Sequence, residues 1–109
     1  MRNFPKSPRR IARRADLPKS KTPASYCVET PSGQTVLHAN KRKRQVLEAL
    51  IEGPIFCASA VRIGPRVQEL REELGKEFIT TNWHRGYEDG EPIRFGSYEL
   101  AWNVKEAQQ

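Results

Sequence analysis

Apolar residues recur at helical intervals in two short segments of this chain, Lys41 to Glu52 and Pro65 to Leu74. Asn40 can cap the first segment, and Gly53-Pro54 ends it, because proline cannot continue a helix. Pro65 suits the first turn of the second segment, and Gly75 suits the position just after its last turn. The sequence therefore predicts two short helices with a brief connector between them.

Strand-like sequence lies before and after these helices. Downstream, Glu77 to Trp83 and Ile93 to Trp102 are rich in β-branched and aromatic residues, and Arg85 to Pro92 between them has turn chemistry. This pattern predicts a two-stranded antiparallel hairpin with a long charged tip. Upstream, Tyr26 to Leu37 places β-favouring residues on both sides of Pro31-Ser32-Gly33, which predicts a short hairpin or strand pair.

The order of a helix, a connector, a second helix and a hairpin is that of a winged helix. The segment VRIGPRVQELREEL, followed by FITT and later by RFGSYEL, resembles the small winged helix-turn-helix domains common in bacteriophage and prophage proteins. The resemblance covers Lys41 to Val104 and implies an α+β winged helix with a two-stranded wing. It also implies that Pro65 to Leu74 enters the major groove of DNA. One departure is that Ile55 to Ile63 is shorter than the usual second helix of that family.

Positive charge is concentrated at the N-terminus. Residues 1–25 carry eight Lys and Arg against one Asp, a net charge of +7, whereas the other 84 of the 109 residues carry −1. This segment has four prolines and almost no large apolar residues beyond Phe4, Ile11 and Leu17. We expect a disordered basic arm, because so little apolar surface cannot offset the entropy of ordering. The expected organisation is an arm over 1–25, a hairpin or linker over 26–40, a winged helix over 41–104 and a tail over 105–109.

The basic charge favours a polyanionic partner, and with the resemblance it predicts a DNA-binding protein, either a transcriptional regulator or an architectural factor, with duplex DNA as its partner. The predicted contacts are the arm residues Arg9, Arg10, Arg13 and Arg14, the basic run Lys41, Arg42, Lys43 and Arg44, the residues Arg62, Arg66 and Gln68 around the start of the second helix, and the hairpin residues Arg85 and Arg94.

Arg66 and Gln68 are of the types that recognise base edges. The basic run is expected to contact phosphates, because cations at a helix start oppose its dipole and suggest another anion. The acidic residues of the second helix, Glu69, Glu72 and Glu73, would repel phosphates, so either its C-terminal half stays clear of DNA or the helix meets a protein. Solvated arginines paired with these acids are an equal alternative. Aromatic residues Trp83, Tyr98 and Trp102 are expected to pack in the hairpin and core.

Catalysis, cofactors and metals find no support in the sequence. His38 and His84 lie far apart, and no catalytic motif occurs. Cys27 and Cys57 lack the paired short spacing of a zinc site, so zinc would require the fold to gather these scattered residues. No apolar stretch is long enough to span a membrane, and the expected location is the cytoplasm, on the nucleoid if the source is bacterial. Two other functions stay open: an RNA- or ribosome-associated protein, and a winged helix used as a protein-interaction module.

Overall fold

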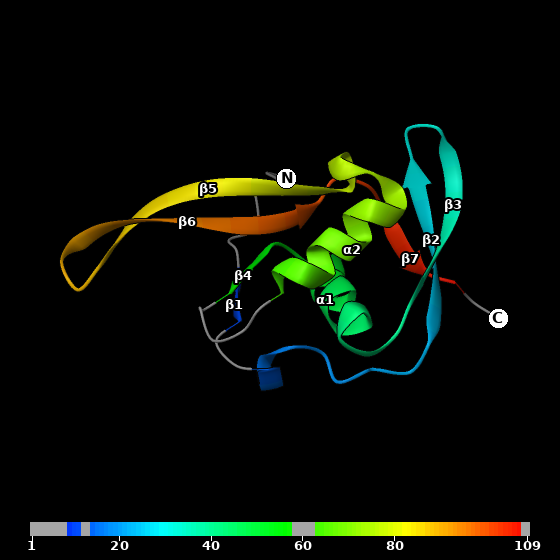
Figure 1. Ribbon diagram of the computed structural model, residues 1–109, viewed down its shortest axis with the longest axis horizontal. Helices are drawn as coiled ribbons and strands as arrows, with labels where there is room; N and C mark the ends of the chain where they lie inside the picture. Colours follow the sequence, from blue (N-terminus) through cyan, green and yellow to red (C-terminus); the bar gives the residue numbers. More distant parts are fainter. Residues whose placement is uncertain (1–8, 12–13, 58–62, 108–109) are drawn as a thin grey trace, which may run out of the picture.

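Strands make up more of the structure than helices do. The computed structural model describes residues 9–11, 14–57 and 63–107. Within them, two α-helices and seven strands form two sheets, one in the order β1-β4-β6-β5 and the other in the order β3-β2-β7. In Figure 1 the helices occupy the middle of the molecule, with the three-stranded sheet on one side and the β5–β6 hairpin extending away on the other.

The three-stranded sheet is antiparallel. Strands β2 (Ala24–Thr30) and β3 (Gly33–Ala39) form the hairpin expected around Pro31, Ser32 and Gly33. Strand β7 (Val104–Glu106) pairs with the other edge of β2, and Val28 lies opposite Val104. Alternate residues of β2 and β3 are buried, so one face of this sheet packs on the core and the other faces solvent.

The two helices form where the apolar spacing predicts them. Helix α1 (Lys41–Glu52) begins after Asn40, whose backbone is extended but whose side chain makes no capping hydrogen bond. Helix α2 (Gly64–Leu74) has proline in its first turn, and Gly75 with φ of 109° follows its last residue. The helical stripes that join the buried core are Val46, Leu47, Ala49 and Leu50 of α1 and Val67 and Leu70 of α2.

The four-stranded sheet combines a parallel and two antiparallel pairings. Strand β1 (Arg9–Ile11) runs parallel to β4 (Ile55–Cys57), and β4 pairs with β6 at Ile55 and Tyr98. Short 3-10 helices, η1 (Arg14–Asp16) and η2 (Lys76–Phe78), follow β1 and α2.

Strands β5 (Ile79–Glu88) and β6 (Glu91–Leu100) form one long antiparallel hairpin. Its turn is only Asp89 and Gly90, with φ of 51° and 79°. Two left-handed residues give a turn whose twist matches that of paired strands, and Asp-Gly is a preferred pair for it. The tip expected over Arg85 to Pro92 is therefore mostly strand, and by its strand rise the hairpin is about 30 Å long from base to tip.

The expected winged helix is wrong. Seven strands in two sheets do not fit a helix-rich fold with a two-stranded wing. The physical reason is that Tyr26, from the segment assigned to a hairpin or linker, and Val104, the last residue assigned to the winged helix, are buried in the core. Burying them requires β2, β3 and β7 to pair, and this pairing joins residues far apart in sequence, which local spacing does not reveal.

The expected disordered arm is also wrong for Arg9–Ile11 and for residues 14–25. Ile11 and Leu17 are buried in the core, and β1 completes the edge of the four-stranded sheet. Helix α1 holds the following segment, because the Gln45 Nε2 donates to the Pro18 carbonyl at 2.7 Å and the Lys41 N–H donates to the Lys21 carbonyl at 2.7 Å. Two buried apolar side chains are enough to order this segment, because α1 also supplies hydrogen-bond donors to its backbone carbonyl groups. Residues 1–8 and 12–13 lie outside the described part.

No helix among the described residues is long and apolar enough to cross a membrane.

Candidate nucleic-acid interface

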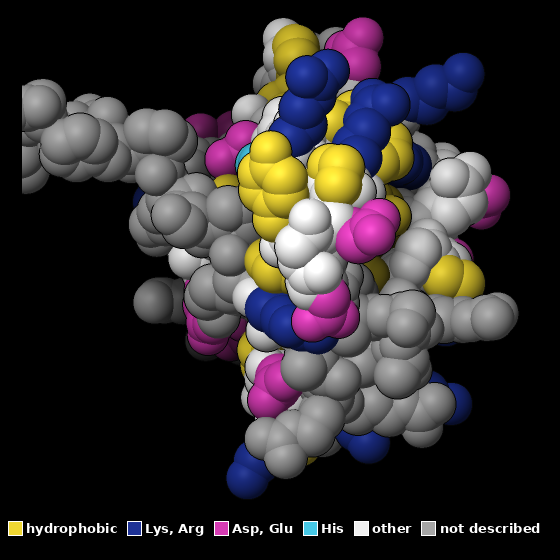
Figure 2. Space-filling view, turned by 90° about the vertical axis from the view of Figure 1, so that its left-hand side faces the viewer, with side chains coloured by type: hydrophobic (Ala, Val, Ile, Leu, Met, Phe, Trp, Pro, Cys, Tyr) yellow, Lys and Arg dark blue, Asp and Glu magenta, His cyan; other side chains and the backbone are white. Residues whose placement is uncertain are grey.

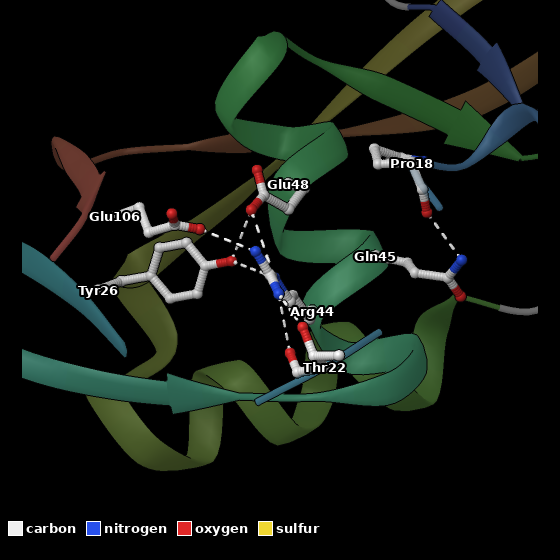
Figure 3. A network of polar contacts seen from close by, with 7 residues as sticks. All are labelled: Pro18, Thr22, Tyr26, Arg44, Gln45, Glu48 and Glu106. Carbon is white, nitrogen blue, oxygen red and sulfur yellow. Dashed lines mark hydrogen bonds and ion pairs between the residues drawn. The ribbon is translucent and has the colours of Figure 1, made fainter. Parts of the chain in front are cut away.

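Two of the four cations at the start of α1, Lys43 and Arg44, pair with acidic side chains of the same chain. Lys43 forms an ion pair with Glu73 of α2. Arg44 donates to Tyr26 Oη at 3.1 Å and to Glu106 Oε1 at 2.8 Å, and its Nε lies 3.5 Å from Glu48 Oε1. Figure 3 shows this guanidinium in the middle of the network. For Lys43 and Arg44, the anions that offset the basic helix start are therefore carboxylates of the chain itself, and a phosphate is not needed to explain these two cations.

Arg44 and Tyr26 stabilise the fold through hydrogen bonds within the protein. The Arg44 side chain is only 12% exposed, and its Nη1 also donates to the carbonyl and hydroxyl oxygens of Thr22 at 2.9 and 2.8 Å. Tyr26 donates to Glu48 Oε1 at 2.7 Å. Burial and this hydrogen bond raise the pKa of Tyr26 to about 12. Arg44 thus joins β2, β7 and the N-terminal segment to α1.

The predicted base-reading residues of α2 are also paired within the helix. Arg66 Nη1 lies 3.1 Å from Glu69 Oε1, and Gln68 Nε2 lies 3.4 Å from Glu72 Oε1. Both contacts are on the surface, where such pairs contribute little stability. The surface of α2 therefore offers alternating charges and no concentrated positive potential. Arg62 lies outside the described residues.

The structure describes some of the predicted arm contacts and not others. Arg10 is exposed on β1, at the edge of the sheet that carries the hairpin. The structure places the backbones of Arg9 and Arg14, in β1 and η1, whereas Arg13 lies outside the described part. Of the α1 cations, Lys41 is exposed and Arg42 is half-buried.

The two predicted hairpin residues lie together. Arg85 of β5 and Arg94 of β6 are directly opposite each other, and both are exposed. Opposed residues of an antiparallel pair point to the same face, where like charges destabilise the pair. No carboxylate of the described residues forms an ion pair with either arginine. These two cations are thus available to an external anion.

Aromatic side chains flank this arginine pair on the same face. Trp83 and Tyr87 precede and follow Arg85 at alternate positions of β5, and they are 62% and 80% exposed. The Arg94 guanidinium lies over the Trp83 ring, 4.6 Å from its centroid. We call Trp83, Arg85, Tyr87 and Arg94 the hairpin face. In Figure 2, which looks toward the hairpin end, Lys and Arg side chains stand beside hydrophobic ones.

A glycine lets the indole lie close to the backbone of the hairpin. Gly96 is directly opposite Trp83, and a Cβ at Gly96 would lie 3.3 Å from Trp83 Cζ3 and from Thr81 Cγ2. Further out, an open hollow of about 580 Å³ borders the arginines; it is lined by Arg85, Gly86, Tyr87, Pro92, Ile93 and Arg94. The hairpin face therefore has a packed indole at one end and an open surface around the arginines.

Helix α2 holds the base of the hairpin. Arg71 Nη2 donates to the Ile79 carbonyl at 2.7 Å and to Thr81 Oγ1 at 2.9 Å, and the guanidinium lies 5.9 Å from the centre of the Tyr98 ring. Because this guanidinium contacts both strands, the face is anchored where it leaves the body of the protein.

The opposite face of the hairpin has different chemistry. His84 Nε2 and Ser97 Oγ are 2.7 Å apart, and the His84 ring stacks on Phe95 with centroids 5.0 Å apart. Phe95 in turn contacts Phe56 of β4. These side chains pack together, so the exposed aromatic and basic groups belong to one face only.

Of the three aromatic residues expected to pack in the hairpin and core, Tyr98 and Trp102 pack against the core. Trp83 lies on the hairpin close to Gly96 and under Arg94, but 62% of it stays exposed. Tyr87 was not among the predicted contacts. The available signal was the alternation of Trp83, Arg85 and Tyr87, which puts all three on one face of a strand.

The scattered Cys and His residues do not meet in the described structure. Exposed Cys27 and His38 lie on the three-stranded sheet, whereas His84 lies on the hairpin. Among the residues that the structure describes, no group of three or more His, Cys, Asp or Glu side chains could hold a metal ion.

Comparisons of the chain with models of protein families, with curated proteins and with solved structures find no match.

Proposed function

We propose that this protein binds DNA through the hairpin face. The observation that carries the proposal is the exposed, directly opposed pair of Arg85 and Arg94, which lies between Trp83 and Tyr87 on a projecting hairpin. Opposed like charges cost stability, and the contact of Arg94 with the Trp83 ring involves only one of the two arginines. A phosphate backbone supplies the anion that would offset their repulsion.

The shape and charge of the chain support the same function. A two-stranded β-ribbon fits the major groove of DNA, which is about 12 Å wide. The hairpin is such a ribbon, and Figure 1 shows it extending clear of the two helices. The chain has a net charge of +6, and exposed Arg10 lies in the same sheet as the hairpin. Such charge favours association with nucleic acid.

The test is a salt series of DNA binding with charge-matched variants. We expect Arg85→Gln/Arg94→Gln to weaken duplex binding and to reduce the slope of log K against log salt by about 1.8, because each lost phosphate contact removes about 0.9. The control is Lys76→Gln/Lys105→Gln, which removes two exposed charges away from the hairpin face and should change the slope much less.

Equal effects of the two double variants would contradict the proposal, since binding would then depend on total charge alone. An RNA duplex of the same sequence distinguishes the RNA alternative: tighter binding of RNA at equal salt would overturn the assignment to DNA. Absence of binding to any nucleic acid at low salt would favour a protein-interaction module.

A further inference from the structure

The aromatic residues of the hairpin face remain largely exposed, even though Trp83 contacts Arg94 and lies close to Gly96. Large exposed apolar side chains in the described residues are Val36, Trp83 and Tyr87, and the latter two flank the arginine pair. Burial of such rings is a main source of stability, so their exposure on one projecting face suggests that a ligand covers them.

The arrangement alternates ring and cation. Along β5 the order is Trp83, Arg85, Tyr87, with about 13 Å between the two aromatic positions by strand rise. The Arg94 guanidinium lies over the Trp83 ring at 4.6 Å, and Gly96 brings the indole close to β6. A guanidinium plane or an indole face can each stack on a nucleobase.

The rings and cations of the hairpin face match duplex DNA and single-stranded DNA differently. In a duplex the faces of the bases are covered by their neighbours, and only base edges are accessible in the grooves. Tyr and Trp rings match base faces, which are exposed only in unpaired nucleotides. An alternation of rings and cations along a strand also matches the alternation of bases and phosphates along a single strand.

We infer that the hairpin face binds unpaired nucleotides of DNA. One base stacks on Tyr87, a second base stacks on the Arg94 guanidinium that the Trp83 ring supports, and Arg85 contacts the phosphates between the stacked bases. This inference rests on the proposed function and specifies its ligand: single-stranded DNA, or single-stranded stretches beside duplex, is preferred over duplex alone.

The experiment compares four ligands at equal salt: an oligothymidine strand, an abasic strand of the same length, a duplex of that length, and oligouridine. The abasic strand keeps the phosphates but lacks the bases. We expect the oligothymidine to bind more tightly than both the abasic strand and the duplex. Trp83→Ala should weaken oligothymidine binding about 5- to 150-fold, the range for one stacked base, and leave the abasic strand within about 2-fold.

Two further variants complete the test. Val36→Ala removes an exposed apolar side chain from the other sheet and should leave all four affinities unchanged. Gly96→Val keeps the indole but displaces it, because a Cβ there would lie 3.3 Å from Trp83 Cζ3, and should reduce the preference for oligothymidine. Thermal melts of each variant show whether it is folded.

The inference fails if the abasic strand binds as tightly as oligothymidine, or if Trp83→Ala weakens the duplex and the single strand equally. Tighter binding of oligouridine would overturn the assignment to DNA. Failure of the proposed function looks different: no DNA form binds, or Arg85→Gln/Arg94→Gln leaves every affinity unchanged.

Discussion

Replacement of Arg44 by glutamine separates a structural role for this residue from a role in phosphate binding. Its guanidinium donates to the Thr22 carbonyl at 2.9 Å, to Tyr26 Oη at 3.1 Å and to Glu106 Oε1 at 2.8 Å. Glutamine keeps part of the length of the side chain but loses the charge and most of the donors. The substitution therefore removes contacts to three separate segments at once.

The size of the effect follows from the burial of each partner. Hydrogen bonds to charged groups contribute about 1.5–3 kcal/mol each, and loss of one partner of a fully buried ion pair costs about 3–5 kcal/mol. The Glu106 and Glu48 side chains are 55% and 26% exposed, so water can solvate much of the charge that Arg44 leaves behind. We therefore expect the free energy of unfolding to fall by about 2–4 kcal/mol and Tm to fall by about 10–20 °C.

Urea denaturation followed by far-ultraviolet circular dichroism measures the loss. The control is Lys41→Gln, an exposed position in the same basic run, which should change the free energy of unfolding by less than about 0.5 kcal/mol. The reasoning is refuted if Arg44→Gln is as stable as the unmodified protein while its DNA affinity falls for all sequences alike. That result would mean that Arg44 contacts phosphate, as its place in the sequence suggests.

Two more predictions concern the core. Because the folded-state pKa of Tyr26 is about 12 and its ordinary value is 10.0, the stability that depends on the neutral phenol is present below pH 10 and is lost as pH rises from 10 toward 12. Tyr26→Phe should thus show a smaller fall in urea midpoint over that range, and parallel profiles for the two proteins would contradict the assignment. Ile11→Ala should lower the free energy of unfolding by about 2–4 kcal/mol, because Ile11 is buried on β1; no change in the urea midpoint would mean that the N-terminal segment contributes nothing to the fold.

Local signals in the sequence were enough to locate the helices and the long hairpin. Helix α1 has the bounds that its apolar spacing and Gly53-Pro54 predict, and α2 begins one residue before Pro65. The two helices and the hairpin depend on contacts between residues that are near in sequence. Part of the candidate site was also predictable, since the sequence analysis names Arg85 and Arg94 as contacts. Their direct opposition depends on the register set by the turn at Asp89 and Gly90.

Three features depend on the tertiary structure alone. They are the pairing of strands into sheets, the role of the basic run and the exposure of the aromatic residues of the hairpin face. Strand β7 pairs with β2, and β1 pairs with β4, across long separations that no local periodicity encodes. Arg44 is structural because the β2–β7 pairing places Glu106 beside it and the segment before β2 places Thr22 beside it. Trp83 has the alternating pattern of a packing residue, but at its place opposite Gly96 in the hairpin it stays 62% exposed. Burial and charge pairing depend on which segments meet in space, and that is fixed by the burial of the whole core and not by the spacing within any one element.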